Sequence, residues 1–518
     1  MAIATHESLW IATERGEPHP RLEEDLEVDV AIIGGGMLGI TAAHLLKEAG
    51  RTVAVIEADR ILGGVTGHTT AKVTSQHSTL LQKIASRHGE AKARLYAQAN
   101  EEAKETISRT IDMFDIDARF TRAPAYVYTT EADKVDELKK EAEYAQRAGI
   151  AASVVTETEL PFPVAAALRY ENQAHFHPRK YLLALAARIP GQGSHVFEKS
   201  PVTSYEDGKP CTVETAGGTV TADQVILATN VPIDDRMNFV TRMKPRRHYG
   251  LAGRNDDAKV EGMYINIGGD SNRSIRPYRS DDGPMLVFVG ASHPTAHKED
   301  TRIPYDELER FALQHFPKTA LQYRWSSQDF YSLDHLPLVG KIGYTSRNVY
   351  TGTGFQGWGM TNTTAAAAVL RDLITGQENP WSGLYDPFAG GRMVKDMLQP
   401  ESFKAQAHIA KRFLGDRFQG RSEGPAPGEG VVTTMDGKRV AVYKDPEGHV
   451  ITRSATCTHM GCIVNWNNTE KSWDCPCHGS RFGVDGNPVH GPATAPLAEV
   501  ETKTEKKEKR EAEVSGRR

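Results

Sequence analysis

The 518-residue sequence has only five cysteines, nearly balanced charge and no extended apolar stretch. Its 62 Lys and Arg residues against 67 Asp and Glu give a net charge of −5, which provides no electrostatic basis for binding nucleic acid or an anionic membrane. No apolar run approaches the roughly 20 residues that span a bilayer. The first twenty residues lack the basic and apolar segments of a secretory signal. We therefore expect a cytoplasmic protein without a membrane span.

The distribution of the cysteines is more informative than their number. Cys211 stands alone in a strand-like segment, where a small buried residue is expected, and the other four lie between positions 457 and 477. A disulfide scaffold would spread its cysteines along the chain, whereas a cluster indicates metal or redox chemistry. Apolar residues make up 39% and charged residues 25% of the chain, which is ordinary globular usage and excludes a largely disordered protein.

A nucleotide-binding pattern begins near residue 28. The apolar run 28–33 and the turn GGGMLG (34–39) precede a helical pattern that ends at Gly50, and a second buried strand follows at 52–59. Gly34, Gly36 and Gly39 match G-x-G-x-x-G, in which the glycines allow a tight turn and the close approach of a pyrophosphate to a helix N-terminus. Glu57 ends the second strand and can accept hydrogen bonds from ribose hydroxyls.

A second glycine cluster lies far along the chain. Polar helices are expected over 88–117 and 131–148 with a strand at 125–130, then a β-meander over 201–230, a strand at 285–291 and a helix at 304–316. After a strand at 347–351, the sequence GTGFQGWG (352–359) precedes an Ala-rich helix. The N-terminus of that helix suits the negative N1/O2 end of a reduced flavin. Two distant segments that touch one long cofactor indicate FAD.

The first 390 residues resemble the FAD-dependent amine and D-amino-acid oxidase superfamily, which includes glycine and sarcosine oxidases. The resemblance lies in DVAIIGGGMLGITAA, SLW, GGVTGHTTA, FHPRKYLLALAA, DQVILATN and DHLPLVG…NVYTGTGFQGWGM. It implies that Thr66, Gly67, His68 and Thr69 contact the pyrophosphate and the flavin. It also implies that the adenine lies near Val202, and that the pyrimidine end of the flavin lies near Gly357, Met360 and Thr361. TGHT replaces the SGRN-like sequence of other members, so His68 could contact the flavin or be attached to it; the alternative is a hydrogen-bonded loop histidine.

Residues that could contact the substrate are less well defined. Tyr249 and Arg276 lie in segments that resemble the substrate domain's sheet, and an arginine can clamp a carboxylate through two parallel hydrogen bonds. Trp358 in the second glycine turn could form a wall of the pocket. Surface pairing or core packing is an alternative for all three. No catalytic triad is visible, and hydride transfer to a flavin does not require one.

Two boxes near the C-terminus carry the strongest chemistry. CTHMGC (457–462) and CPCHGS (475–480) each offer cysteine and histidine side chains, and 15 residues between His459 and Cys475 can form a hairpin that brings the boxes together. Two cysteines and two histidines suit either a tetrahedral Zn²⁺ or a Rieske [2Fe–2S] cluster. Glycines around the boxes allow backbone N–H groups to approach the ligands.

Residues 427–500 resemble the disulfide-containing branch of the Rieske iron–sulfur family, on the two boxes and a GPA sequence at 491–493. The resemblance implies Cys457 and Cys475 on one iron, His459 and His478 on the other, a disulfide between Cys462 and Cys477, and a proline loop over the cluster. It also places Ser480 against a bridging sulfide. Phe482 stands where high-potential relatives often have tyrosine, so one hydrogen bond to a ligand sulfur is missing. We therefore expect the reduction potential of the cluster to lie in the lower part of the Rieske range.

The expected fold is an α/β (α+β) FAD-binding domain with a Rossmann-type βαβ unit and an antiparallel-sheet substrate domain, followed by a small all-β Rieske domain. The boundaries are an N-terminal extension (1–26), the oxidoreductase domain (27–390, with its substrate subdomain at about 85–200 and 240–330), a helical linker (391–425), the Rieske domain (426–502) and a charged tail (503–518). We found no internal repeat.

These features indicate an enzyme with two redox cofactors. The hypothesis is a dehydrogenase that oxidises a C–N bond of a small amine or amino acid and passes electrons from FAD through the [2Fe–2S] cluster to an external protein or quinone. The same arrangement allows electrons to flow in from a donor. The alternative is an electron-transfer or redox-sensing protein without amine turnover. A Rieske oxygenase is disfavoured because its mononuclear iron triad is not evident.

Overall fold

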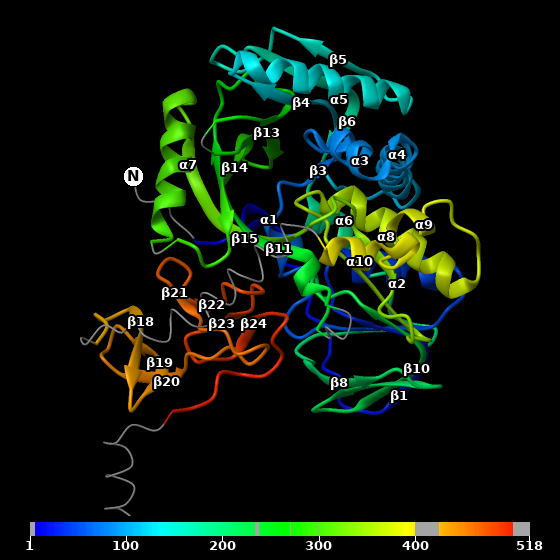
Figure 1. Ribbon diagram of the computed structural model, residues 1–518, viewed down its shortest axis with the longest axis vertical. Helices are drawn as coiled ribbons and strands as arrows, with labels where there is room; N and C mark the ends of the chain where they lie inside the picture. The colour runs from blue at the N-terminus through cyan, green and yellow to red at the C-terminus, as the bar shows by residue number, and fades with distance from the viewer. Residues whose placement is uncertain (1–5, 234–237, 270, 299, 399–423, 501–518) are drawn as a thin grey trace, which may run out of the picture. The chain divides into compact units, whose positions relative to one another are not determined.

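A computed structural model describes residues 6–500 except 234–237, 270, 299 and 399–423 (Figure 1). The chain forms two units. Unit 1 comprises Met1–His293 and Ile303–Ser402, and unit 2 comprises Pro294–Arg302 and Phe403–Arg518. The segment 294–302 therefore belongs to unit 2, although the chain on both sides of it belongs to unit 1. The predicted charged tail lies outside the described residues, as does most of the predicted helix 392–418.

The first sheet of unit 1 is built around the predicted βαβ unit. β1 (Leu26–Ile33) pairs in parallel with β2 (Val53–Ile56) and with β10 (Thr219–Leu227). Along β1, Val30 and Ile32 join a core with α2 (Met37–Glu48) and α8 (Gly359–Thr375), while Ala31 and Ile33 join a second core on the other face. Burial on both faces is the reason that this strand is continuously apolar. The sheet order is β16 (Leu338–Lys341), β17 (Val349–Thr353), β10, β1, β2, β7 (His195–Phe197), with β8 (Val202–Glu206) and β9 (Cys211–Thr215) attached.

The second sheet of unit 1 has nine strands. Its order is β15 (Ala320–Ser332), β11 (Met243–Arg254), β14 (Gly283–Pro294), β13 (Arg273–Ser280), β12 (Met263–Asn266), β4 (Thr121–Thr129), β6 (Ala166–His175) and β3 (Lys72–Val73), with β5 (Ala152–Val155) on β6. The antiparallel arrangement expected from the sequence is observed except between β4 and β12, which run parallel. α7 (Arg302–His315) contributes Tyr305 and Leu308 to the core on one face of this sheet.

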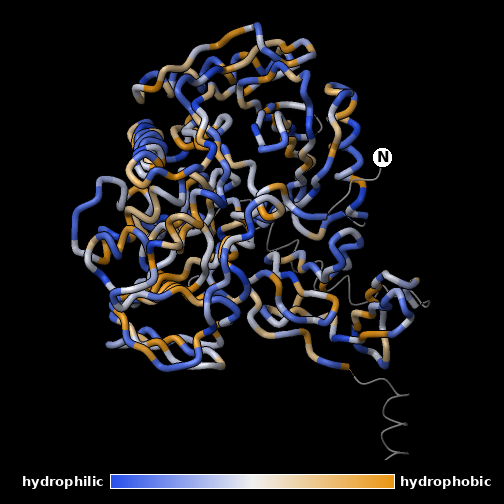
Figure 2. Tube along the Cα trace, turned by 180° about the vertical axis from the view of Figure 1, so that it is seen from behind, coloured by the Kyte–Doolittle hydropathy of each residue, from blue (hydrophilic) through white to orange (hydrophobic). Residues whose placement is uncertain are grey.

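The remaining helices of unit 1 are short or amphipathic. The predicted helix 88–117 is α4 (Glu90–Met113), which begins directly after Gly89 with φ +89°. A further helix that was not predicted, α3 (Leu80–His88), ends at that glycine. The predicted helix 131–148 is α5 (Val135–Arg147), preceded by a 3₁₀ turn. The others are α1 (Leu9–Thr13), α6 (Pro178–Ala186), α9 (Ser382–Tyr385) and α10 (Arg392–Met397). Hydrophobic (orange) and hydrophilic (blue) residues alternate along the trace in Figure 2. Among the described residues, no helix is both long and apolar enough to cross a membrane.

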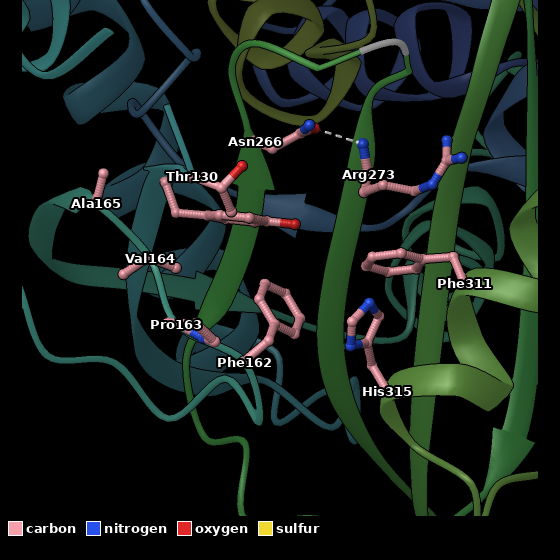
Figure 3. A pocket seen from close by; sticks show the side chains of 10 residues that line it. Thr130, Phe162, Pro163, Val164, Ala165, Asn266, Arg273, Phe311 and His315 are labelled. Carbon is pink, nitrogen blue, oxygen red and sulfur yellow. Dashed lines mark hydrogen bonds between the residues drawn. The ribbon is translucent and has the colours of Figure 1, made fainter. Parts of the chain in front are cut away.

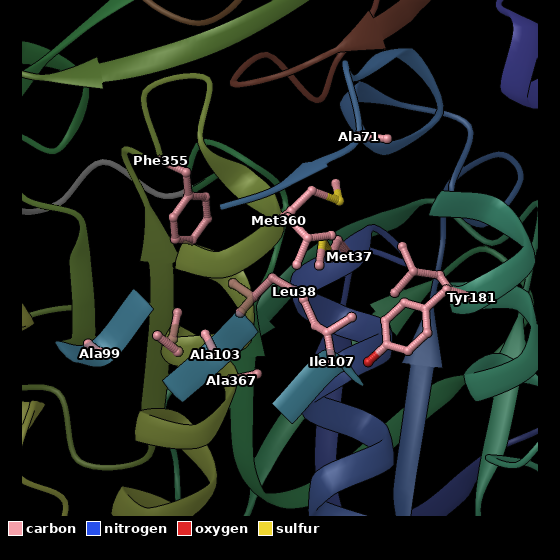
Figure 4. Close-up of a cluster of buried hydrophobic side chains, with 14 of the residues drawn as sticks. Met37, Leu38, Ala71, Ala99, Ala103, Ile107, Tyr181, Phe355, Met360 and Ala367 are labelled. Atoms are coloured by element: carbon pink, nitrogen blue, oxygen red, sulfur yellow. The ribbon is translucent and has the colours of Figure 1, made fainter. Parts of the chain in front are cut away.

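A shared core brings the two glycine-rich turns together. Met37 and Leu38 at the start of α2 pack in one cluster with Phe355 and Met360, which flank the start of α8 (Figure 4). A Cβ added to Gly352 would lie 2.8 Å from Leu38 Cδ2, so the strand before the second turn runs directly against α2. The N-termini of α2 and α8, which are 322 positions apart in sequence, are therefore held by one set of apolar contacts.

The predicted all-β architecture of unit 2 is confirmed in the described residues. One sheet contains β18 (Glu429–Met435), β19 (Lys438–Lys444) and β20 (Val450–Ser454), and the other contains β21 (Asn465–Asn467), β22 (Ser472–Asp474), β23 (Arg481–Phe482) and β24 (Pro488–His490). All of their pairings are antiparallel. The cysteine boxes lie in the loops before β21 and β23, and their four cysteines join Trp473 and Phe482 in the core of this unit.

Candidate functional site

The first glycine turn leaves no room for a side chain at Gly34 or Gly39. Gly34 adopts φ +108°, and a Cβ at Gly39 would lie 1.9 Å from the Gly34 carbonyl oxygen. A Cβ at Gly36 would meet only the Thr66 hydroxyl, at 3.6 Å, so the turn is open on that side. Gly36 caps α2, whose first N–H groups are the donors that a pyrophosphate requires. This cradle fits the phosphates of a dinucleotide.

Glu57 supports that turn from the end of β2. One carboxylate oxygen accepts the Gly35 N–H at 2.7 Å and the other accepts the Asp59 N–H at 3.0 Å. Burial raises the pKa of the Glu57 carboxyl, and these backbone hydrogen bonds oppose the rise. The residue stands beside the glycine turn, as the spacing predicted, and its role toward ribose stays a prediction.

The TGHT loop is held by the N-terminal segment. The predicted residues 66–69 lie in or beside the 3₁₀ turn Val65–His68. Thr66 Oγ1 accepts the Met37 N–H at 3.0 Å, and a Cβ at Gly67 would lie 2.6 Å from the Leu62 carbonyl oxygen. Trp10 Nε1 donates to the Thr69 carbonyl at 2.7 Å, and His68 Nδ1 is 2.7 Å from the Gly64 carbonyl oxygen. The SLW sequence is thus a buried support for this loop.

The second glycine turn faces the same region. Gly357 adopts φ +80°, and its N–H donates to the Asp329 carboxylate of β15. Trp358 stacks on His77 with ring centroids 4.8 Å apart, and Thr361 Oγ1 donates to the Thr74 carbonyl at 2.9 Å. These contacts join the turn to the segment that follows the TGHT loop.

Orphaned polar atoms at this turn fit a bound cofactor. The Gln356 side-chain nitrogen and the Asn362 side-chain oxygen are buried and have no protein partner within the described residues. Buried polar atoms of this kind normally have a partner, and the edge of an isoalloxazine ring offers both donors and acceptors. The residues at both turns therefore fit FAD.

The three predicted substrate contacts lie in different environments. Tyr249 is fully buried on the α7 side of the second sheet, where its hydroxyl is 2.9 Å from His293 Nε2. Arg276 is fully buried and donates to the backbone carbonyls of Thr70, Phe176 and Pro277. Of the three, Trp358 alone lies in a predicted flavin-binding segment. Val202 is half-buried at the start of β8, packed against the second core of the first sheet.

Sequence reasoning missed a polar group beside the second turn. Asp329 and Tyr331 lie two residues apart on β15, and the Tyr331 hydroxyl is 3.1 Å from His248 Nε2. A Cβ at Gly357 would lie 3.1 Å from the Tyr331 hydroxyl. The alternation of β15 puts Asp329 and Tyr331 on one face, but no local motif marks which face points to the turn.

In unit 2, the two boxes converge around the four predicted ligands. Cys457 and Cys475 are buried free thiols within hydrogen-bond distance of each other, and the His459 and His478 rings are 5.0 Å apart. The Nδ1 atoms of both histidines are buried without a protein partner in the described part of the chain. Burial lowers the pKa of His478 to about 4, so its imidazole is neutral, which is the form that binds metal. Two thiols and two orphaned imidazole nitrogens fit a Rieske [2Fe–2S] cluster.

The second pair of cysteines is joined as the resemblance implied. Cys462 and Cys477 form a disulfide between the two boxes. Three sulfur atoms, those of Cys462, Cys475 and Cys477, lie within 4.8 Å of one another, but the disulfide leaves only Cys475 of these three as a ligand. Ser480 is fully buried and accepts the Ala493 N–H at 3.1 Å, which ties the predicted proline loop to the second box. Cys211 is buried, as predicted.

A cavity of about 610 Å³ opens on the α7 side of the second sheet (Figure 3). Tyr128, Phe162 and Phe311 supply aromatic walls, and Arg273 and His315 supply its basic groups. Asn266 accepts the Arg273 N–H at 2.5 Å across one end. None of the site residues predicted from the sequence lines this cavity.

Comparison with known families accounts for both units. Residues 29–373 match the model of the FAD dependent oxidoreductase family. The chain belongs to this family. Residues 420–501 match the Rieske [2Fe-2S] domain. As a member with an appended Rieske domain, the chain is an enzyme that binds FAD and a [2Fe–2S] cluster, as its sequence predicted.

Individual relatives agree with this assignment. The chain is 34% identical over 501 residues to the Rieske 2Fe-2S iron-sulfur protein YhfW of Bacillus subtilis, covering 96% of this chain and 97% of that protein. It is 26% identical over 418 residues to gamma-glutamylputrescine oxidoreductase of Escherichia coli, covering 76% and 96%. The structure of glycine oxidase from Geobacillus kaustophilus superposes with a TM-score of 0.58 at 19% identity, covering 70% of this chain and 98% of that one. The last similarity confirms the predicted α/β fold of the oxidoreductase domain.

Proposed function

We propose that this FAD-dependent oxidoreductase oxidises a C–N bond of a small amine or amino acid and delivers the electrons through its [2Fe–2S] cluster to an external acceptor. Oxidation of the substrate CH–NH unit to C=N releases two electrons and two protons. The cluster carries one electron at a time, so each turnover requires two transfers to an acceptor protein or quinone. Bound FAD supplies the two-electron chemistry.

The observation that carries the proposal is the presence of two complete cofactor sites in one chain. Unit 1 has the glycine cradle and the orphaned polar atoms of the second turn, and unit 2 has two free thiols and two orphaned imidazole nitrogens. The amine substrate is supported by the relatives, which include gamma-glutamylputrescine oxidoreductase and glycine oxidase. A cluster would have no evident use if the electrons went directly to oxygen.

The roles of individual residues follow from these sites. We assign Cys457, Cys475, His459 and His478 as the cluster ligands. We assign the first glycine turn and residues 66–69 to the pyrophosphate and flavin of FAD, and Gly357, Met360 and Thr361 to the pyrimidine end. The Cys462–Cys477 disulfide holds the two ligand loops together. The two neutral imidazoles, whose Nδ1 atoms are buried, suit metal ligation because no proton has to be displaced from the ligating nitrogen.

The direct test is anaerobic reduction of the full-length holoenzyme by candidate amines and amino acids. Flavin absorbance and the electron paramagnetic resonance signal of the reduced cluster are followed together. We expect the flavin to bleach and the cluster then to become reduced. A flavin that bleaches while the cluster stays oxidised would refute the electron path. A redox-sensing protein would show neither change with any amine, but redox-dependent binding of a partner.

A further inference from the structure

The cavity on the α7 side of the second sheet lies on the face opposite to the predicted flavin-binding segments. On β13, Arg273 lines the cavity, whereas Arg276 donates to the Thr70 carbonyl beside the TGHT loop. On β4, Tyr128 belongs to the core under α7, and Val127 belongs to the core that contains α2 and α8. Because side chains alternate between the faces of a strand, the sheet separates a ligand in this cavity from the flavin-binding segments.

Aromatic rings form much of the wall of this cavity. The centre of the Phe162 ring lies 5.8 Å from that of Tyr128 and 4.4 Å from that of His315. The Phe311 and His315 rings are 4.9 Å apart, and Figure 3 shows these side chains of α7 turned toward Phe162. Burial lowers the pKa of His315, so its imidazole is neutral at pH 7. The volume of about 610 Å³ is in the range of small-molecule sites, and the walls suit a flat apolar group.

The Tyr128 hydroxyl is a polar group of this cavity that lacks a protein partner. Tyr128 is only 3% exposed, and its hydroxyl forms no hydrogen bond within the part of the chain that the structure describes. A buried tyrosine hydroxyl normally has a hydrogen-bond partner. Burial raises the pKa of Tyr128, so the hydroxyl keeps its proton and can donate it to an acceptor. A ligand acceptor in the cavity would supply the missing partner.

Arg273 supplies positive charge to the same cavity. Its Nη1 donates to the Ser271 hydroxyl and, at 2.9 Å, to the Asn272 carbonyl. Its Nε is buried without a protein partner among the described residues, where the guanidinium also forms no ion pair and feels Glu307 of α7 only at longer range. Its charge lowers the pKa of Tyr128 against the effect of burial, so the two groups are neighbours. A guanidinium has five N–H donors, so those of Nη2 remain for an anion.

We propose that this cavity is a second small-molecule site and that it binds an aromatic carboxylate. The ring of the ligand packs between Phe162 and Phe311. Its carboxylate accepts hydrogen bonds from the Tyr128 hydroxyl and from Arg273. One cation and one neutral donor suit a monoanion, and a phosphate dianion is disfavoured because His315 is neutral. The site does not depend on the proposed amine-oxidising function, because its residues lie on the other face of the sheet.

The test is isothermal titration calorimetry of the full-length holoenzyme with three matched probes. Phenylacetate carries both the ring and the charge, phenylethanol lacks the charge, and cyclohexylacetate lacks the aromatic ring. We expect phenylacetate to bind at one saturable site per chain, at least about tenfold more tightly than either of the other two. The flavin absorption spectrum, recorded in the same titration, is expected to stay unchanged because the sheet separates the two sites.

Two variants assign the binding to this cavity. Tyr128→Phe keeps the ring and removes only the unpartnered hydroxyl, and Arg273→Gln removes the charge. Each is expected to weaken phenylacetate binding by about 10- to 100-fold, as for a charge-assisted hydrogen bond. The matched controls are Tyr344→Phe, at a tyrosine that is 61% exposed, and Arg279→Gln, at an exposed arginine of the same strand. Both controls should bind phenylacetate like the wild type.

Three results would overturn the proposed site. The first is an absence of saturable phenylacetate binding at millimolar concentrations. The second is phenylethanol or cyclohexylacetate binding as tightly as phenylacetate. The third is wild-type affinity in Tyr128→Phe together with a shifted flavin spectrum, which would place the probe at the flavin instead. FAD content and circular dichroism report the folding of each variant. If Arg273→Gln does not fold, Tyr128→Phe decides the matter, because its hydroxyl has no protein partner in the described residues.

Discussion

Ser480 is the residue through which the cluster potential can be tested most directly. Its buried hydroxyl lies within hydrogen-bond distance of the Cys457 thiol as well as the Ala493 N–H. A hydrogen bond to a ligand sulfur stabilises the reduced, more negative cluster and so raises the potential. We expect Ser480→Ala to retain the cluster and to lower its midpoint potential by roughly 60 mV, the one-electron equivalent of about 1.4 kcal/mol.

A redox titration followed by circular dichroism measures this change. Phe482→Tyr is the matched variant with the opposite expectation, because a hydroxyl on this buried ring adds a donor in the core that holds the ligand cysteines. Its potential should rise. An unchanged or higher potential in Ser480→Ala would contradict the assigned role of Ser480.

The ligand assignment has its own test at the residue scale. Cys457→Ser and His478→Ala should each abolish the cluster, because each removes one of four ligands. Iron and acid-labile sulfide, measured per chain, should fall from two of each to near zero. Cys211→Ser is the control, since this buried thiol lies in unit 1 and should leave the iron content unchanged. A colourless wild-type protein with one zinc would contradict the cluster.

At the scale of elements, the strand–turn–helix of the first sheet can be tested at Gly39. A Cβ there would lie 1.9 Å from the Gly34 carbonyl oxygen, so the turn must move. We expect Gly39→Ala to lower the FAD content at least tenfold, equivalent to about 1.4 kcal/mol of binding energy, while iron content is unchanged. Gly383→Ala is the control, because a Cβ there meets nothing within 4 Å. Full FAD content in Gly39→Ala would show that the turn does not hold the pyrophosphate.

Unit 2 contains a second testable element, the segment 294–302 with the β21–β22 hairpin. Thr301 Oγ1 lies 2.7–2.8 Å from side-chain oxygens of Asn467, Asn468 and Thr469. Asn465 Nδ2 also donates to the Ala296 carbonyl at 3.0 Å. Thr301→Val keeps the shape but leaves buried polar groups without a partner, which costs about 1–3 kcal/mol.

Hydrogen–deuterium exchange measures that loss locally. Amide exchange in 294–302 and in the hairpin should become roughly 5- to 150-fold faster, which corresponds to the same energy range. Thr203→Val, which removes an exposed hydrogen bond of unit 1 to the Glu214 carbonyl, should leave these amides unchanged. Unaltered exchange in Thr301→Val would mean that the segment is held by its other contacts.

At the scale of the molecule, acid stability of unit 1 should depend on Asp334. Burial alone would raise the pKa of this carboxyl, but the Arg392 guanidinium, bonded to both of its oxygens, lowers it to about 2. A depressed carboxyl pKa contributes stability that is complete above the unfolded value near 4 and is lost as the pH falls toward 2. The contribution amounts to about 2 kcal/mol. Arg392, which lies in the predicted linker (391–425), is thus bonded to Asp334 of unit 1.

Thermal unfolding between pH 2 and pH 7 measures this contribution. The wild-type protein should lose stability below pH 4, and Asp334→Asn should be less stable at pH 7 and depend less on pH in that range. Asp256→Asn is the control, because its exposed ion pair with Arg254 contributes little. Equal pH dependence in the wild type and Asp334→Asn would contradict the assigned role of the pair.

Several features could be read from the sequence because they are local. The strand–glycine–helix pattern specifies a turn within a few residues, and the cysteine boxes carry all four proposed ligands within 22 positions. Family resemblance extended these motifs to a fold and to the Cys462–Cys477 pair, which the structure confirms. The predicted helix 88–117 is α4 (Glu90–Met113), but the helix α3 (Leu80–His88) before Gly89 was not predicted.

The sequence by itself indicated the two cofactors, through short local motifs for each and through the family resemblance that decided between a zinc site and a [2Fe–2S] cluster. Only the tertiary structure decided which side chains face the second glycine turn. Tyr249 and Arg246 are three positions apart on one strand, yet they point to opposite faces, and the pairing with β15 sets Arg246 against Asp329. That outcome depends on strand register between segments about 80 residues apart, and a shift of one residue would reverse every face.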